Sequence, residues 1–187
     1  MTRDFYSNGS FHVYNRGALK QKLFHEERDY IRFLFIMFAF MGEKKIHHIA
    51  RILGQHQRLD VIEALINIQE EVLLVQKVEI LAFCLMPNHF HLLLREMRDN
   101  GIANYMLRLG DSYAKYFNIK NGKSGHVFQN NYQFREINSD EQLLNTINYI
   151  HNNPFLICHD VSQYQWSSAS DYHGENRWGA YLNKYEP

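Results

Sequence analysis

Cysteine, proline and long apolar runs are scarce in this chain. Its 187 residues include 2 cysteines, Cys84 and Cys158, and 3 prolines. Two cysteines are too few for the disulfide framework of a small secreted domain, and residues 1–6 lack the apolar segment of a secretory signal, so we expect a reducing, cytoplasmic setting. The most apolar run, residues 31–41, contains Arg32 and is much shorter than the roughly 20 residues of a membrane-spanning helix, so we expect no membrane partner.

A net charge is absent as well. Lys+Arg and Asp+Glu number 20 each, so composition alone does not predict a strongly basic nucleic-acid surface. The distribution is uneven, however, because residues 101–135 hold five basic side chains, Asp111 as the one acidic side chain, and several Tyr and Phe residues. Basic and aromatic side chains together suit single-stranded nucleic acid. An amphipathic helix followed by a solvated loop would have the same composition, so both interpretations stay open.

Hydrophobic periodicity predicts alternating strands and helices. Strands are expected at residues 11–15, 78–85, 89–95 and 127–137. Helices are expected at residues 26–41, 58–75, 102–119 and 139–152. Apart from the helix at 58–75, this order matches an α+β, ferredoxin-like βαββαβ sandwich: an antiparallel sheet with two helices on one face and the last helix near the other.

Residues 1–187 are expected to form one domain with a helical insert at about 42–75. The insert either packs on the domain or meets a second copy of the chain in a homodimer. At the last helix, Ser139 and Gln142 have the spacing of a capping box. Pro154 predicts the end of this helix, with Asn153 pushed out of helical geometry because it precedes a proline.

The segment Met86-Pro-Asn-His-Phe-His-Leu92 carries the strongest chemical signal. Residues i and i+2 of a strand point to the same face, so His89 and His91 would lie side by side while Phe90 faces the core. Two imidazoles placed in this way can share one metal ion. The alternative is a pair of solvated histidines on an exposed sheet face.

The last helix carries the second signal. Residues i and i+4 share a helix face, which aligns Asn145, Tyr149 and Asn153. Tyr149 could be a nucleophile beside a third metal ligand, or an ordinary helix residue whose hydroxyl meets water. A cation held by two histidines and one oxygen ligand can polarise a phosphodiester, and attack by Tyr149 would then leave a covalent phosphotyrosine.

Five motifs together carry a family resemblance. They are Phe11-His-Val-Tyr-Asn-Arg-Gly17, Cys84-Leu-Met-Pro-Asn-His-Phe-His-Leu-Leu93, Gly125-His-Val-Phe-Gln129 through Tyr132, Tyr149-Ile-His-Asn-Asn-Pro154 and Trp166-Ser-Ser168. In these motifs the chain resembles the single-tyrosine HUH transposases, and within them it is most similar to the REP-associated tyrosine transposases.

The resemblance implies a role for each matching residue. His89 and His91 would be metal ligands and Asn153 the third ligand, and the metal would be Mg²⁺ or Mn²⁺. Tyr149 would attack the DNA phosphate and hold the 5′ phosphate. The substrate would be single-stranded DNA with a hairpin, as in a palindromic repeat, and cutting and rejoining would share one site.

Contacts to DNA are expected from side chains in and around the basic stretch. The candidates are Arg16, Lys120, Lys123, Gln129, Asn130, Tyr132 and Arg135. Lysine and arginine suit phosphate contacts, and Tyr132 could stack on an unpaired base. Each of these residues has an equally good structural interpretation from the sequence alone.

Two other functions are compatible with the same motifs. The chain could be a DNA-binding protein that recognises palindromic repeats without cutting them, or a metal-dependent phosphodiesterase that uses water and does not need Tyr149. The joint presence of His89, His91 and Tyr149 favours covalent chemistry over simple binding.

Overall fold

A computed structural model describes residues 5–44, 46 and 61–185. The strands are β1 (Ser10–Arg16), β2 (Val78–Met86), β3 (His89–Glu96) and β4 (Gln133–Ile137). The helices are α1 (Glu27–Ala39), α3 (Val61–Ile66), α4 (Gln69–Leu73), α5 (Gly101–Asn121), α6 (Asp140–Asn152) and α7 (Ala169–Tyr172), joined by short 3₁₀ turns. Within these ranges, every helix is too short or too polar to span a lipid bilayer.

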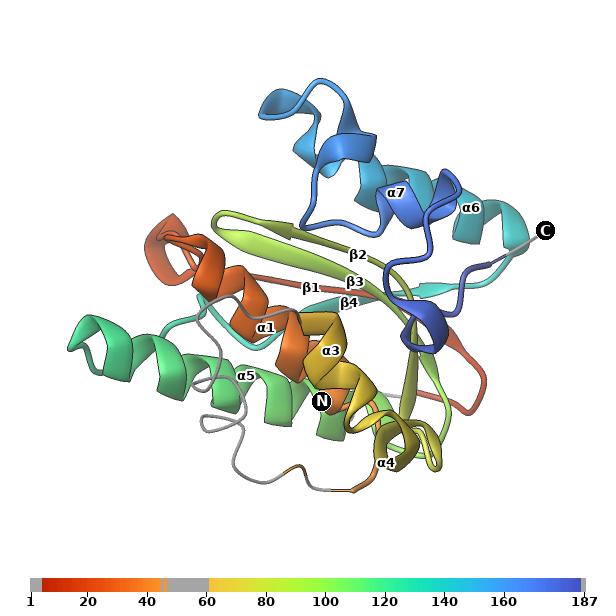
Figure 1. Cartoon of the computed structure of the whole chain (residues 1–187), viewed down its shortest axis with the longest axis horizontal. Coiled ribbons are helices and arrows are strands. Elements are labelled where there is room, and N and C mark those ends of the chain that lie inside the picture. The colour runs from red at the N-terminus through yellow and green to blue at the C-terminus, as the bar shows by residue number, and fades with distance from the viewer. Residues whose placement is uncertain (1–4, 45, 47–60, 186–187) are drawn as a thin grey trace.

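The four strands form one antiparallel sheet in the order β2-β3-β1-β4 (Figure 1). This is the strand order of a ferredoxin-like βαββαβ fold, as predicted. The two central strands, β1 and β3, pair from Ser10 opposite Arg95 to Arg16 opposite His89. Side chains from both central strands therefore share each face of the sheet.

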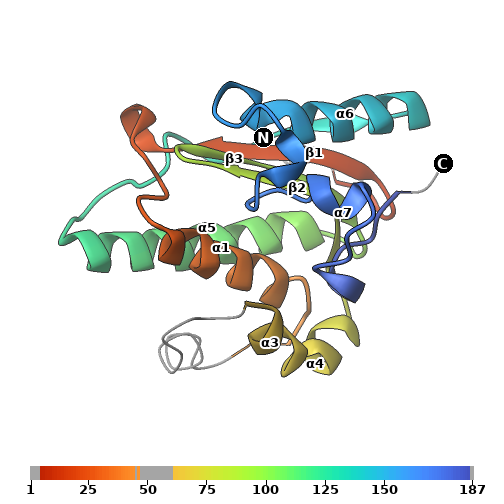
Figure 2. The ribbon, with the colours of Figure 1, turned by 45° about the horizontal axis from the view of Figure 1, so that its top comes forward.

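Helices cover both faces of the sheet (Figure 2). On one face, α1 and α5 pack against Phe11, Val13 and Phe90 in the main hydrophobic core. On the other face lies α6, whose Leu143, Ile147 and Ile150 pack against β2 and β3 in a smaller core. The predicted position of the last helix is confirmed, and the polar side chains of β1 and β3 lie beneath it.

The insert differs from the single predicted helix at 58–75. Residues 61–73 form two short helices, α3 and α4, with a tight turn at Asn67–Ile68 in which the Ile68 amide donates to the Leu65 carbonyl. β-branched residues and asparagine have low helix propensity, which favours the break. Residues 58–60 lie outside the described part. Leu65 and Val72 are buried in the same core as α1, so this part of the insert packs on the domain.

The predicted strand at 127–137 begins only at Gln133. Residues 127–132 instead run as a loop beside the end of β1, where the Gln129 amide donates to the Arg16 carbonyl at 2.9 Å. Phe128 makes an isolated bridge with Gly17. The apolar pattern of this segment therefore reflects burial of Val127 and Tyr132 in the core rather than a continuous strand.

Both ends of α6 differ in detail from expectation. Ser139 Oγ accepts from the Gln142 amide at 3.2 Å as predicted, but Gln142 Oε1 accepts from the Asn138 amide, one residue earlier than in a standard capping box. Asn153 is helical (φ −55°, ψ −39°), contrary to the prediction. The helix continues into a 3₁₀ turn, Asn153–Leu156, with Pro154 near its start, where a missing N–H costs nothing.

Candidate active site

Three elements meet at the candidate site: β1, β3 and the C-terminal half of α6. His89 and His91 project from β3 toward α6, and Phe90 between them lies in the opposite core, as the alternation predicted. Across the β1–β3 pairing, Arg16 lies opposite His89 and Tyr14 lies opposite His91. The sheet thus places the two imidazoles at one end of its central strands, under the helix that carries Tyr149.

His89 lies between two carboxamide oxygens. Its Nδ1 is 2.7 Å from Asn88 Oδ1, and its Nε2 is 3.0 Å from Asn153 Oδ1. A neutral imidazole has one N–H and one lone pair, so it can donate to only one of these oxygens. If Nδ1–H donates to Asn88, the lone pairs of His89 Nε2 and Asn153 Oδ1 face each other. A cation held by both atoms would satisfy them.

His91 is buried and bonded to a residue that the sequence did not single out. Its Nδ1 lies 2.9 Å from His12 Nε2, and the two ring planes are inclined by 29° with their centroids 5.0 Å apart. His12 alternates with the core residues Phe11 and Val13 on β1, which puts it on the α6 face. That alternation is visible in the sequence, but its meeting with His91 depends on the pairing of β1 with β3.

Burial keeps these imidazoles neutral. Desolvation, with smaller contributions from the neighbouring histidines, lowers the pKa of His91 from 6.5 to about 3. Desolvation and the positive charge of Arg135 lower the pKa of His12 to about 4. The pKa of His89 is also lowered, again mainly by burial. At neutral pH each ring therefore carries a lone pair, as a metal ligand requires.

Tyr149 lies over this cluster. Its ring is edge-on to His91, with centroids 5.5 Å apart, and to His12, with centroids 5.7 Å apart. Tyr149 is 55% exposed, so it lies at the surface of the site, where a substrate can reach it. Asn153 follows one turn later on the same helix and contacts His89. The structure therefore brings Tyr149, His89, His91 and Asn153 together, as the two sequence motifs predicted.

The donor set fits a divalent cation. Two neutral imidazoles and one carboxamide oxygen supply three ligands of the mixed nitrogen and oxygen type that Mn²⁺ accepts. Mg²⁺ prefers oxygen ligands, so the two imidazoles favour Mn²⁺. Each histidine also has its Nδ1 held by a neighbour, as is usual for metal-bound histidines. Within the described ranges, no cluster of three or more His, Cys, Asp or Glu side chains is placed to hold a metal.

Four of the predicted DNA-contact residues surround this site. Arg16 ends β1 opposite His89, and Arg135 on β4 lies directly opposite His12. Gln129 and Asn130 are exposed in the loop beside β1, where the Asn130 carbonyl accepts from Asn15 Nδ2 at 3.1 Å. The loop that was expected to be a strand thus brings its polar side chains to the same end of the sheet.

The other three predicted contacts lie elsewhere. Lys120, near the C-terminal end of α5, pairs with Asp29 and with Glu26 of the layer beneath the sheet. Lys123 is exposed just after α5, with its Nζ 5.8 Å from the centre of the Phe117 ring. Tyr132 is buried in the main core. These residues are not brought together with Tyr149.

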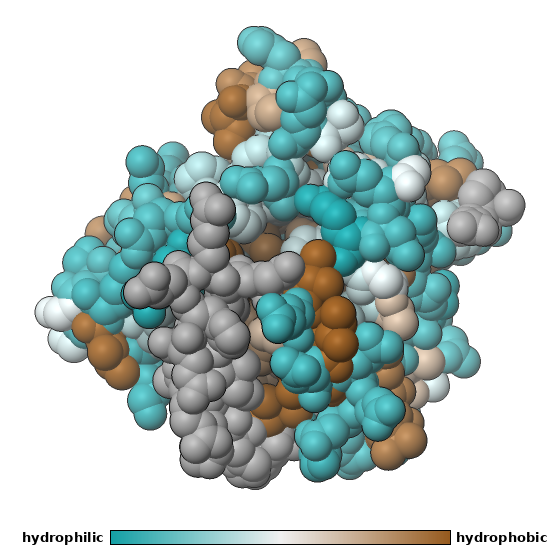
Figure 3. All heavy atoms as spheres, in the orientation of Figure 1, coloured by the Kyte–Doolittle hydropathy of each residue, from teal (hydrophilic) through white to brown (hydrophobic). Residues whose placement is uncertain are grey.

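An exposed apolar segment follows the site directly. Phe155, Leu156 and Ile157 are 54%, 91% and 56% exposed, and this end of the molecule carries a visible group of hydrophobic side chains at the top of Figure 3. They come immediately after Asn153 and Pro154. The surface near the site therefore includes exposed apolar side chains as well as the cations Arg16 and Arg135.

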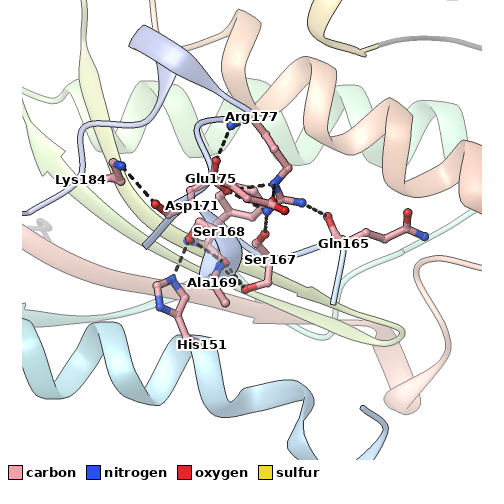
Figure 4. A network of polar contacts seen from close by, with 10 residues as sticks. His151, Gln165, Ser167, Ser168, Ala169, Asp171, Glu175, Arg177 and Lys184 are labelled. Atoms are coloured by element: carbon pink, nitrogen blue, oxygen red, sulfur yellow. Dashed lines mark hydrogen bonds and ion pairs between the residues drawn. The ribbon is translucent and has the colours of Figure 1, made fainter. Parts of the chain in front are cut away.

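A buried polar network fixes α6 to the sheet (Figure 4). His151 Nε2 on α6 is 2.9 Å from Ser168 Oγ, and Ser168 Oγ accepts from the Phe83 amide of β2 at 2.9 Å. The segment around Ser168 is held in turn by Asp171, which pairs with Arg177. His151 lies between Tyr149 and Asn153 in the chain, so this network helps to set their position. The Trp166-Ser-Ser168 motif marked the segment but not this contact.

We expect Ser168→Ala to lower the free energy of unfolding by about 1–3 kcal/mol, because it leaves the buried Phe83 amide and His151 without their partner. Urea unfolding measures the effect. Ser124→Ala, in the exposed loop after α5, is the control and should change stability by less than about 0.5 kcal/mol. Equal stability of the two variants would show that the network does not anchor α6.

Stability should fall as the pH falls from 7 to 5. The pKa values of His12, His91 and His151 are lower in the folded chain than the usual 6.5, so the unfolded chain binds more protons in this window. Each histidine should therefore contribute a loss of up to about 1.4 kcal/mol per pH unit below about 6.5. Urea unfolding in EDTA at pH 7 and pH 5 measures this loss. Asp29, whose pKa is lowered, titrates below the window, whereas Glu96, whose pKa is raised by burial, acts in the opposite direction to the three histidines. A flat profile would contradict the burial of neutral imidazoles.

Comparison with known proteins gives one family and one fold. Residues 42–153 match the family model described as "Transposase IS200 like". No curated protein matches the chain. A solved structure of a REP-associated tyrosine transposase bound to a REP hairpin is 14% identical, with a TM-score of 0.56, over 91% of this chain and 82% of that chain. A Deinococcus radiodurans R1 protein described as a transposase is also 14% identical, with a TM-score of 0.34, over 81% of this chain and 96% of that chain. The likeness to the hairpin-bound protein confirms the predicted fold.

Proposed function

This chain belongs to the IS200-like transposase family, and we propose that it cuts and rejoins single-stranded DNA through a covalent bond to Tyr149. The observation that carries the proposal is the convergence of the Tyr149 ring with His89, His91 and Asn153 at one end of the sheet. The proposed substrate is hairpin DNA from a palindromic repeat, because the similar fold described above belongs to a protein bound to a REP hairpin.

The proposed reaction is a transesterification. The Tyr149 hydroxyl oxygen attacks a DNA phosphorus, the bond from phosphorus to the 3′ oxygen breaks, the phenol loses its proton and the 3′ oxygen leaves as a hydroxyl. The 5′ phosphate stays on Tyr149. Attack by a 3′ hydroxyl on this phosphotyrosine reverses the step and rejoins a strand, so no external energy source is needed.

His89, His91 and Asn153 would hold Mg²⁺ or Mn²⁺. Such a cation would supply stabilisation of charge on the phosphate and on the leaving oxygen. The chain's own contribution is the orientation of the ligands: Asn88 holds Nδ1 of His89, and the network at Ser168 holds the helix that carries Asn153. Burial keeps the two imidazoles neutral and ready to bind.

Arg16, Gln129, Asn130 and Arg135 are the proposed DNA contacts, because they border the site and are exposed. Arginine can pair with phosphate oxygens, and the two carboxamides can hydrogen-bond to base edges. Lys120 and Tyr132 are engaged within the protein, so we leave them out of the proposed contact surface.

The test is a search for a covalent intermediate. The protein is incubated with 5′- and 3′-labelled single-stranded hairpins and Mn²⁺, and the products are separated in SDS. An SDS-stable adduct that retains the strand 3′ of the cut supports the proposal. Retarded DNA without cleavage would support a palindrome-binding protein, and cleavage without an adduct would support a phosphodiesterase that uses water. Either of these outcomes would overturn the proposal.

A further inference from the structure

His12 has no role in the proposed reaction, yet it occupies the centre of the site. It is 7% exposed, and its Nε2 lies 2.9 Å from His91 Nδ1. The rings of Tyr14 and Tyr149 also contact it, with centroids 5.1 and 5.7 Å from the centroid of the His12 ring. Arg135 lies opposite His12 on β4. A buried imidazole in such a position must be satisfied by its neighbours.

Only one proton can lie between His12 Nε2 and His91 Nδ1. The nitrogen to which this proton is bonded determines whether His91 can bind a cation through its other ring nitrogen, Nε2. If His91 Nδ1–H donates to His12 Nε2, the other ring nitrogen of His91, Nε2, keeps its lone pair. If His12 Nε2–H donates instead, neutral His91 carries its proton on Nε2 and cannot bind a cation there. The contact therefore sets the state of His91 as a ligand.

The neighbouring histidine favours the first arrangement. His89 Nδ1 lies 2.7 Å from Asn88 Oδ1 and His89 Nε2 lies 3.0 Å from Asn153 Oδ1, so the arrangement of His89 that can share a cation with Asn153 is the one whose Nδ1–H donates to Asn88. His12 would then act on His91 in the same way as Asn88 acts on His89. In each case the neighbour accepts the Nδ1–H of the histidine and leaves its Nε2 free to bind the metal.

We propose that His12 is a positioning residue that accepts the Nδ1–H of His91 and thereby fixes His91 in the tautomer whose Nε2 binds the cation. The inference rests on the proposed function, since it assigns His91 to a metal. Supporting residues of this kind typically change metal affinity 10–100-fold when they are lost.

The first test reads the tautomer directly. In metal-free protein labelled with ¹⁵N-histidine at pH 7.5, long-range ¹H–¹⁵N spectra should show His91 protonated on Nδ1. In His12→Leu, which removes the acceptor at similar volume, the Nε2–H form of His91 should become populated. His12→Gln should keep the wild-type tautomer, because a glutamine oxygen can stand close to the place of Nε2. An Nε2–H form of His91 in the wild type, or no change in His12→Leu, would overturn the proposal.

The second test measures Mn²⁺ binding by calorimetry without DNA. We expect His12→Leu to bind Mn²⁺ about 10–100-fold more weakly than the wild type, and His12→Gln to stay within about threefold. Tyr14→Phe, which keeps the ring next to His12 and His91, should bind Mn²⁺ normally, so that a weaker affinity in His12→Leu is not a general effect of changing a neighbour of His91. Equal Mn²⁺ affinities of wild type and His12→Leu, or no Mn²⁺ binding by the wild type, would overturn the proposal.

Two controls keep the outcome clear. Circular dichroism and thermal unfolding establish that each variant is folded, and if His12→Leu does not fold, the wild-type tautomer and the His12→Gln titration decide. If the wild type has the expected tautomer and binds Mn²⁺ but forms no adduct with hairpin DNA, the proposed function fails and the role of His12 stands. If the adduct forms but His91 has the other tautomer, only the role of His12 fails.

Discussion

Tyr149→Phe should abolish the covalent protein–DNA adduct and reduce strand cleavage by at least about a thousandfold, because it removes the attacking oxygen. The fold should be unaffected, since Tyr149 is 55% exposed and its ring contacts with His12 and His91 are retained by phenylalanine. Labelled hairpin DNA and SDS gels measure the adduct, and a mobility-shift assay should show that DNA binding persists.

Tyr14→Phe is the matched control. Tyr14 is the other tyrosine near the cluster, with its ring centroid 5.7 Å from His91, and its removal should leave adduct formation within about threefold of the wild type. Adduct lost in Tyr14→Phe but kept in Tyr149→Phe would reverse the assignment. Tyr113 and Tyr116, which lie on α5, have hydroxyl groups that are already hydrogen-bonded within the protein. The Tyr113 hydroxyl donates to the Leu23 carbonyl, and the Tyr116 hydroxyl donates to Asp29.

Removal of either histidine should have a comparable effect on cleavage. His89→Ala and His91→Ala each delete a proposed ligand. The rate of cleavage should therefore fall by at least about a thousandfold, and the affinity for Mn²⁺ should fall by about a hundredfold. The two variants should differ in stability. His91 is buried beneath α6 and bonded to His12, whereas His89 is partly exposed, so His91→Ala should unfold at a lower urea concentration than His89→Ala.

His25→Ala is the control for histidine loss, since His25 is exposed on the other side of the sheet, near Phe117 of α5. It should cut hairpin DNA at the wild-type rate. Persistent cleavage in His89→Ala would contradict the metal assignment, because only two of the three proposed ligands, His91 and Asn153, would then remain.

Short-range patterns in the sequence predicted the part of the site that lies on single elements. Strand alternation placed His89 and His91 on one face with Phe90 in the core, and helical spacing placed Tyr149 and Asn153 one turn apart. Both patterns depend only on the geometry of a strand or a helix. The order of strands and helices also predicted the ferredoxin-like sheet.

Contacts between distant segments could not be predicted in the same way. The bond from His12 to His91 spans 79 residues and exists because β1 pairs with β3 in one register. The bond from Ser168 to the Phe83 amide spans 85 residues and depends on the path of the C-terminal segment over β2. Such contacts follow from tertiary packing, for which local periodicity carries no signal.

Local rules also failed where packing overrode them. Asn153 precedes a proline yet remains helical, which keeps its side chain 3.0 Å from His89 Nε2. The apolar residues at 127–132 suggested a strand, but the segment buries Val127 and Tyr132 while it loops past the end of β1. In both places the departure from the local rule puts side chains around the candidate site.

The most direct test of the account is the position of Mn²⁺ in crystals of this protein, located by anomalous diffraction. We expect one strong peak bonded to Nε2 of His89, Nε2 of His91 and Oδ1 of Asn153, with Tyr149 beside it. A peak bonded to other side chains, or no peak at this site when Mn²⁺ is saturating, would contradict this expectation.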